Sequence, residues 1–423
     1  MSASNDAASP GKQRLVVDAT AVVTGLAMVA IGCRPLVAAL LGRGDAARWL
    51  QASSLYNRTV LSTNYFQDGF VRRGLGGTIA VLLSSDWLRS VVLFTAASMV
   101  WLSIPVALLL VRMGRRTAIA ATVLFGTVIA LSPQTFLGWG WDPARTDVFA
   151  AGFVAWATLA AVRRKVGIAV ACLLVGVLVH EVALIFGAPL LLVLTRRLVA
   201  AGQLERRDAA RAAIALVAGT IAIVALQSLF SPPAARLAQH MMDAGPPAAD
   251  ADTLRTKLIA AYMQTAGLRG VRTAICFNAL GSPAYAIWAA TGLVVLAAYA
   301  PMFLVRREWP SFLLVAVAPA LLLLVIANDA GRWIQLGVLN AWLFAVAIRC
   351  FEPSGPPSRR QLALAAALLA VLLSLGSARF DRANGVPMRV VVALKMSPPT
   401  SFEQTMQRCD SRWQTDLLPA SRE

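Results

Sequence analysis

Apolar segments of roughly membrane-crossing length recur along nearly the whole chain, separated by short polar stretches. A helix needs roughly 20 predominantly apolar residues to cross a bilayer. The segments are residues 15–41, 87–111, 118–137, 147–162, 166–195, 212–230, 284–305, 311–326, 333–348 and 362–375. This pattern predicts an all-α, polytopic integral membrane protein, because only helices and closed barrels satisfy all of their backbone hydrogen bonds within lipid.

The segment 166–195 is predicted to turn back on itself. Basic residues flank both of its ends, which places both ends on the same side of the membrane. A single helix of that length would extend for ~45 Å and emerge on the opposite side. A hairpin or re-entrant segment resolves this conflict, with His180 and Glu181 at its turn. Counting the segment as two crossings gives about eleven transmembrane helices.

The basic residues predict the orientation of these helices. Tight clusters of arginine and lysine, such as that at 112–116, lie in the short loops, and such clusters favour the cytoplasm. The N-terminus is then cytoplasmic and the C-terminus extracytoplasmic. The predicted transmembrane domain covers residues 1–377, with outer loops at 42–86 and 231–283, and an extracytoplasmic tail covers 378–423. The outer loops also contain arginines, so the orientation depends on the short loops.

Composition excludes a soluble globular domain. The 423 residues are 58% hydrophobic and 14% charged, with a mean hydropathy of +0.67, well outside the range of soluble domains. The net charge of +18 would suit nucleic acid, but basic residues between apolar segments are better explained by membrane orientation, and we expect no nucleic-acid partner. The cysteines form no CxxC pair. Cys276 and Cys409 both fall outside in this topology, where they could pair or remain thiols.

Four polar stretches that interrupt the apolar pattern are all predicted to reach the outer face. They are "NYFQDGFVRRGLGG" at 64–77, "GWGWDPARTD" at 138–147, the turn at 180–181, and "NDAGRW" at 328–333. Ionisable side chains at membrane depth are costly, which makes each of them a functional candidate. The candidate residues are Asn64, Asp68, Arg72, Arg73, Asp142, Arg145, Asp147, His180, Glu181, Asp329 and Arg332.

This set of side chains suits a substrate that carries a phosphate and an attacking hydroxyl group. Carboxylates act as general bases or hold a divalent cation, and arginines recognise phosphate through a planar fork of donors. The predicted roles are catalysis for Asp68, His180 and Glu181, phosphate binding for Arg72, Arg73, Arg145 and Arg332, and support for Asn64, Asp142, Asp147 and Asp329. The expected substrate is a sugar on a polyprenyl phosphate. A divalent cation is an open question, and no other cofactor is expected.

Structural roles are also open for the residues of the first outer loop and of the hairpin turn. Arg72 and Arg73 could bind lipid headgroups near a helix end, and His180 with Glu181 could form a hydrogen-bonded pair that holds the hairpin. Asp68 has no evident capping role in the sequence, which favours a functional one. The four glycines of the same stretch are expected to allow tight turns and the close approach of a ligand.

The later outer loops allow similar structural interpretations. Asp329 and Arg332 could be a helix cap and an ion pair. Asp142 precedes a proline and could form a turn, and Asp147 could cap the following helix. His240, in the loop 231–283, is interpreted as a surface histidine rather than a ligand.

The pattern resembles the GT-C superfamily, the polytopic glycosyltransferases that use polyprenyl-linked sugars. The shared features are a cytoplasmic N-terminus, about eleven helices, a first outer loop with interfacial helices and an acid, and polar residues on later outer loops. The resemblance implies that Asp68 deprotonates the acceptor hydroxyl and that Arg72, Arg73, Arg145 or Arg332 holds the lipid phosphate. The stretches "NYFQDGFVRRGLGG" and "NDAGRW" also resemble an uncharacterised family of bacterial polytopic membrane proteins.

The chain departs from the better-known GT-C branches in two respects. Its first outer loop contains no Asp-x-Asp or adjacent Asp-Glu, so a metal requirement is not implied. No large C-terminal outer domain follows the predicted helices.

The predicted function is glycosyl transfer at the extracytoplasmic face of a bacterial inner membrane, in the assembly of a surface polysaccharide or glycolipid. The partners are then the lipid bilayer and a polyprenyl-linked sugar. The alternatives are a transporter or flippase of a lipid-linked or anionic substrate, and a non-catalytic membrane assembly subunit. Transport would favour polar residues near the bilayer midplane and inverted repeats, and the sequence indicates neither.

Overall fold

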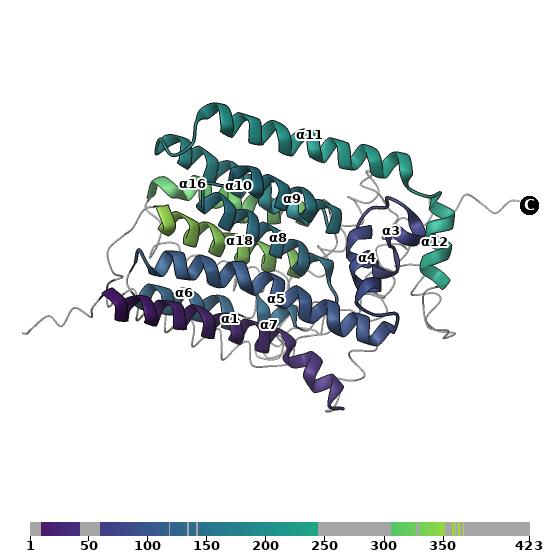
Figure 1. Ribbon diagram of the computed structural model, residues 1–423, viewed down its shortest axis with the longest axis horizontal. Helices are drawn as coiled ribbons and strands as arrows, with labels where there is room; N and C mark the ends of the chain where they lie inside the picture. Colours follow the sequence, from purple (N-terminus) through teal and green to yellow (C-terminus); the bar gives the residue numbers. More distant parts are fainter. Residues whose placement is uncertain are drawn as a thin grey trace, which may run out of the picture.

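The computed structural model describes residues 10–42, 60–117, 119–132, 135–140, 143–243, 306–326 and 330–351, and the single positions 358, 360, 363 and 367. Within these residues the chain forms helices and connecting turns and contains no β-strand. Figure 1 shows the long helices lying side by side with their axes roughly aligned. The predicted all-helical architecture is therefore present.

Nine apolar elements make up most of the described part of the chain. They are α1 (Pro10–Leu40), α5 (Trp87–Gly114), α6 (Ile119–Leu131), α8 (Thr146–Val162), α9 (Val166–Val179), α10 (Val182–Ala200), α11 (Arg206–Phe230), α17 (Ala318–Ile326) and α18 (Ala330–Phe351). The shorter elements are α3 (Tyr65–Asp68), α4 (Gly74–Leu83), α7 (Phe136–Trp139), α12 (Ala234–Asp243), η1 (Arg306–Glu308), α16 (Trp309–Phe312) and the π-helical turn η2 (Leu313–Val317).

Five of these helices are long and apolar enough to cross a membrane. Their apolar parts are Gln13–Leu40, Leu88–Gly114, Val182–Ala200, Arg206–Phe230 and Arg332–Phe351. Helices α6, α8 and α9 are also apolar but shorter, with 13, 17 and 14 residues. The predicted segments 284–305 and 362–375 lie almost entirely outside the described residues. The structure therefore supports a membrane-embedded helical protein, and the number of crossings stays a prediction.

One predicted segment, 118–137, is interrupted in the structure. Helix α6 ends at Leu131, and a separate short helix, α7, begins at Phe136. Pro133 follows the end of α6 in the sequence, and a proline disfavours helical conformation in the residue before it. The Thr135 hydroxyl donates to the carbonyl of Ile129 at 2.6 Å and to that of Ser132 at 3.0 Å. These bonds satisfy carbonyls that the end of the helix leaves without helical partners.

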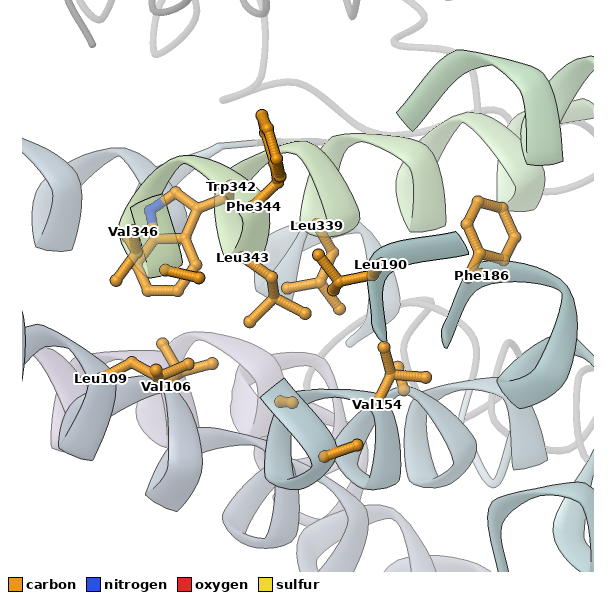
Figure 2. Close-up of a cluster of buried hydrophobic side chains, with 14 of the residues drawn as sticks. Val106, Leu109, Val154, Phe186, Leu190, Leu339, Trp342, Leu343, Phe344 and Val346 are labelled. Carbon is orange, nitrogen blue, oxygen red and sulfur yellow. The ribbon is translucent and has the colours of Figure 1, made fainter. Parts of the chain in front are cut away.

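Helix α18 lies at the centre of the apolar core. Figure 2 shows its side chains Leu339, Trp342 and Leu343 among residues of α5, α8 and α10. The Trp342 indole N–H donates to the carbonyl of Phe125 on α6 at 3.0 Å. The buried Asn340 amide donates to the carbonyls of Phe186 and Val315, at 2.9 and 2.7 Å. These bonds join α18 to α6, α10 and η2, because buried polar groups are costly unless they are hydrogen-bonded.

Helices α9 and α10 form an antiparallel hairpin. A Cβ atom added to Gly176 would lie 2.7 Å from the Ala183 Cβ, and one added to Gly187 would lie 2.3 Å from the Leu173 side chain. Residues 173 and 187 would be ~21 Å apart in a continuous helix. The chain therefore reverses between them, at the break that holds His180 and Glu181.

The alternating helices give the bundle two chemically different ends. At one end, here called the basic end, Arg115 pairs with Asp18 at 3.0 Å. At the same end Arg116 donates to the carbonyl of Cys350, at 2.7 Å, and Arg197 pairs with the buried Glu308 at 3.0 Å. The first residues of α5, α8, α10 and α18 lie at the other end, here called the site end. The described residues of the four candidate stretches thus belong to one end of the bundle.

Candidate functional site

The stretch 64–77 folds into two short helices joined by a tight turn. Asn64 caps α3, because its side-chain oxygen accepts from the backbone N–H groups of Phe66 and Gln67, both at 3.1 Å. Gly69 ends α3 with a φ of 69°, and Arg73 precedes α4 with a φ of 60°. Left-handed backbone is unfavourable for a residue with a Cβ, so the Arg73 conformation must be held by its surroundings.

The glycines of this stretch are approached by the protein itself. A Cβ on Gly77 would lie 1.9 Å from the Thr63 carbonyl oxygen, and one on Gly74 would lie 2.4 Å from the Tyr65 ring. At these two positions glycine is therefore required by contacts within the protein, and not by the expected close approach of a ligand. They allow α4 to pack directly on the backbone and side chains of residues 61–65.

Asp68 is buried and uses both of its carboxylate oxygens within the protein. Its Oδ2 accepts from the backbone N–H of Asn64 at 3.0 Å, and its Oδ1 lies 2.7 Å from His240 Nδ1. Together with the Asn64 cap, this bond resembles a capping box. The Asn64 side chain accepts from backbone N–H groups of α3, and the Asp68 side chain accepts from the backbone N–H of Asn64. The interpretation that Asp68 has no evident capping role was therefore wrong. The bond to Asn64 does not test the prediction that Asp68 also acts in function.

His240 is the functional candidate that sequence reasoning missed. It lies on α12, whose Leu237 and Met241 are buried against Val71. Leu237 and Met241 are four residues apart and therefore lie on one face of the helix. His240 lies beside Met241 and reaches Asp68, 172 positions away in the sequence. In the sequence, the spacing of these two apolar residues is the one signal that α12 packs against another part of the protein.

Glu181 accepts hydrogen bonds from both arginines of the stretch 64–77. Arg73 donates from Nη2 to Oε1 at 2.5 Å and from Nε to Oε2 at 3.1 Å, and Arg72 donates to the same Oε1. Burial by itself would raise the pKa of the Glu181 carboxyl, but Arg73, His180 and Arg72 together hold that pKa well below its usual range. Glu181 is therefore an anion that joins the turn before α4 to the α9–α10 hairpin.

His180, next to Glu181, is nearly fully buried and contacts the start of α8. Its Nε2 lies 2.8 Å from Asp147 Oδ1, and its Nδ1 accepts from the backbone N–H of Val182 at 3.2 Å. The second bond places the ring proton on Nε2, facing the Asp147 carboxylate. Burial first, and then the positive charge of Arg73, lowers the pKa of the His180 imidazole. His180 is therefore neutral near pH 7.

Arg332 completes this cluster from α18. Its Nη1 lies 2.5 Å from Asp147 Oδ2, and its guanidinium carbon lies 5.0 Å above the centre of the Trp333 ring. Arg145 lies close enough to the Asp147 carboxylate to interact with it electrostatically. The sequence offered Asp329 as a partner of Arg332, but Asp329 lies outside the described residues. The partner that the structure shows is Asp147, which uses its carboxylate in this pair rather than in a helix cap.

The structure thus brings most of the candidate residues into two groups at the site end. The first group, called the dyad, is Asp68 with His240, and Asn64 supports it. The second group, called the arginine cluster, contains Arg72, Arg73, Arg145, Asp147, His180, Glu181 and Arg332. Of the remaining candidates, Asp142 and Asp329 lie outside the described residues. Cys276 and Cys409 lie outside them as well.

The arginine cluster carries an excess of positive charge among the described residues. Its four arginines face two carboxylates, Asp147 and Glu181, and its histidine is neutral. Each of these arginines has interactions of its own within the protein, so the excess is a property of the group rather than of one unpaired side chain. Such a group attracts anions. Phosphate fits it well, because guanidinium groups donate to phosphate oxygens in pairs.

The described residues contain no cluster of three or more His, Cys, Asp or Glu side chains arranged to hold a metal ion. The described residues therefore give no support to a bound divalent cation. Asp142 and Asp329 lie outside them, so a cation site that includes these two carboxylates stays untested.

Comparison of the chain with protein-family models, with curated proteins and with solved structures found no match. The resemblance to the GT-C superfamily thus remains an expectation from the sequence. The chemistry of the side chains at the site end is the basis for a functional proposal.

Proposed function

We propose that this protein transfers a glycosyl group from a polyprenyl phosphate or pyrophosphate to an acceptor hydroxyl at the extracytoplasmic face of a bacterial inner membrane. The observation that carries the proposal is the arginine cluster at the same end of an apolar bundle as a buried carboxylate bonded to a histidine. An arginine-rich group suits the phosphate of the donor. A carboxylate–imidazole pair suits the removal of a proton from the acceptor.

In the proposed reaction, the acceptor oxygen forms a bond to the anomeric carbon of the sugar. The bond between that carbon and the phosphate oxygen breaks, and the electron pair leaves with the polyprenyl phosphate. The hydroxyl proton passes to the dyad. Charge thereby develops on the leaving phosphate, and the arginines stabilise that charge more strongly than they stabilise the donor in its ground state.

The membrane arrangement is part of the proposal. We place the basic end in the cytoplasm, since clusters of arginine and lysine in short loops favour that side. The site end is then extracytoplasmic, as in the GT-C arrangement of about eleven helices that the sequence resembles. The polyprenyl chain lies in the bilayer beside the apolar helices, and the phosphate reaches the arginine cluster at the membrane surface.

One observation favours a second candidate, a non-catalytic assembly subunit. Both carboxylates of the arginine cluster are already neutralised by arginines of the same chain. Such pairs also serve to fix helices and loops relative to one another, so the site end could be a rigid surface for a partner protein. A subunit of that kind would keep its role when Asp68 is made neutral.

Transfer by purified protein tests the proposal. The protein is reconstituted in lipid vesicles with a radiolabelled polyprenyl-phosphate sugar and a cell-envelope extract as acceptor, and label in non-lipid product is measured. We expect Asp68→Asn to reduce transfer at least ~100-fold, the usual loss on removal of a general base system. The asparagine keeps an oxygen for the Asn64 N–H, so α3 should remain capped.

Asp18→Asn is the matched control, because it removes a carboxylate from the basic end, where Asp18 and Arg115 are both substantially exposed. It should leave transfer unchanged. Equal transfer by wild type and Asp68→Asn would remove the dyad from the reaction. Uptake of label into the vesicles without product would favour a transporter instead.

A further inference from the structure

We infer that His240, and not Asp68, is the group that takes the proton from the acceptor hydroxyl, and that Asp68 is a positioning residue. This inference rests on the proposed glycosyl transfer. It changes which side chain touches the substrate. It also assigns a role to α12, a helix within the predicted outer loop 231–283.

Access and hydrogen bonding distinguish the two side chains. The Asp68 side chain is 4% exposed, and each of its oxygens already has a partner in the protein, Asn64 N–H for one and His240 for the other. The His240 side chain is 25% exposed. A general base has to come within hydrogen-bond reach of the proton that it removes. His240 can do so through its exposed part, whereas the 4% exposure of the Asp68 side chain leaves little of it within reach of a substrate hydroxyl.

The tautomer of His240 follows from the contact with Asp68. A carboxylate only accepts hydrogen bonds, so the proton of the neutral ring is on Nδ1, which lies 2.7 Å from Asp68 Oδ1. The lone pair of the neutral ring is then on Nε2. When the acceptor oxygen bonds to the anomeric carbon, its proton moves to Nε2, and the imidazolium that results lies beside the Asp68 carboxylate. The ring therefore gains a positive charge at a place where a negative charge is fixed.

Packing fixes the orientation of the dyad. Leu237 and Met241 pack α12 against Val71. Val71 lies in the turn between Asp68 and the arginines 72 and 73. The proton acceptor and two of the phosphate ligands are thus set by one short segment. Such a segment can hold the acceptor hydroxyl and the donor phosphate in a constant relative position, which is a major source of rate enhancement.

The chain offers a favourable test, because it contains only two histidines. His180 is 3% exposed and His240 is 25% exposed. Diethyl pyrocarbonate, which acylates accessible imidazole nitrogen, should therefore modify His240 first in the folded protein in lipid. Peptide mass spectrometry identifies the modified residue, and the vesicle transfer assay is run on the same sample.

We expect transfer to fall in proportion to the modification of His240. We also expect His240→Gln to lower kcat at least ~100-fold with KM within about twofold of wild type, and Asp68→Asn to act on kcat in the same way. The matched control is Gln239→Ala, its exposed neighbour on α12, whose side-chain amide donates to the Asp243 carboxylate at 2.8 Å. This variant should behave as wild type.

Three results would overturn the inference. The first is full transfer by protein in which His240 is fully acylated. The second is His240→Gln with kcat near wild type while Asp68→Asn is inactive, which would make Asp68 itself the base. The third is a His240 that the reagent does not reach in folded protein. A wild-type protein that shows no transfer although His240 is reactive would instead contradict the proposed function, and the proton transfer with it.

Discussion

At the residue scale, the site end depends on a few side chains that each make more than one contact. Asp68 accepts from Asn64 and contacts His240, and Asp147 contacts His180 and Arg332. Each carboxylate joins segments that are distant in the sequence. The removal of one of them should therefore affect both folding and function, and the choice of substitution decides which effect is seen.

Gly77 tests whether α4 needs direct backbone contact. An added Cβ would lie 1.9 Å from the Thr63 carbonyl oxygen, which is backbone and cannot rotate away. We expect Gly77→Ala to lower the free energy of unfolding by about 1–3 kcal/mol, the usual cost of overpacking. Gly167→Ala is the control, because nothing lies within 4 Å of a Cβ there. Thermal unfolding in detergent measures both, and equal stability of the two variants would contradict the packing.

The pH dependence of stability should reflect His180 and Glu181. The pKa of each is lowered in the folded protein, so each contributes stability at high pH that is lost as the pH falls. For His180 the loss begins below the ordinary histidine value of 6.5, because the unfolded chain then binds a proton more readily than the folded one. For Glu181 it begins only below its ordinary value of 4.5.

We therefore expect Tm to be nearly constant above pH 7 and to fall between pH 6.5 and pH 5. His180→Gln should make the curve flatter in that interval. A Tm that rises as the pH is lowered from 7 to 5.5, in wild type but not in the variant, would show that His180 is stabilised by protonation instead.

At the element scale, ion pairs and packing determine how the helices of the site end are placed. Asp147 on α8 pairs with Arg332 on α18, both largely buried, and it also contacts His180 in the α9–α10 hairpin. The pair between Asp18 and Arg115 at the basic end joins α1 to α5 but is about half exposed. The two pairs have the same chemistry in different surroundings.

A double-mutant cycle can compare the two pairs directly. Asp147→Asn alone should cost about 3–5 kcal/mol of unfolding free energy, since it removes the buried carboxylate of a largely buried ion pair. The double variant Asp147→Asn with Arg332→Gln should regain a substantial part of that loss. The corresponding cycle on Asp18 and Arg115 should give a coupling of at most about 1 kcal/mol. Additive effects of Asp147 and Arg332 would show that the pair does not join α8 to α18.

The same elements show what the sequence can and cannot predict. The reversal at His180 and Glu181 follows from hydrophobic length and flanking charge, both of which are local properties. The bond between Asp68 and His240 joins residues 172 positions apart, and no local pattern indicates which histidine an acid will meet. The cap between Asn64 and Asp68 escaped notice because the acid lies one position beyond the usual place for a capping box.

At the scale of the whole molecule, the distribution of charge gives the bundle a direction. Arginines at the basic end meet Asp18, Glu308 and the end of α18, whereas those at the site end form a group with an excess of positive charge among the described residues. The long apolar helices between the two ends carry exposed side chains such as Ile221, Val224 and Leu229, which suit contact with lipid. A lipid-linked anion could therefore reach the arginine cluster from within the bilayer.

Binding of a polyprenyl phosphate to the protein in nanodiscs, measured by native mass spectrometry, tests the central claim most directly. Arg72, whose side chain is 41% exposed, is the arginine best placed to meet the phosphate. We predict that Arg72→Gln weakens binding about tenfold, as expected for the loss of one charged hydrogen bond. The matched variant at the basic end, Arg115→Gln, should bind as wild type does. Equal affinity of all three proteins, or a greater loss in Arg115→Gln, would contradict a phosphate site at this end.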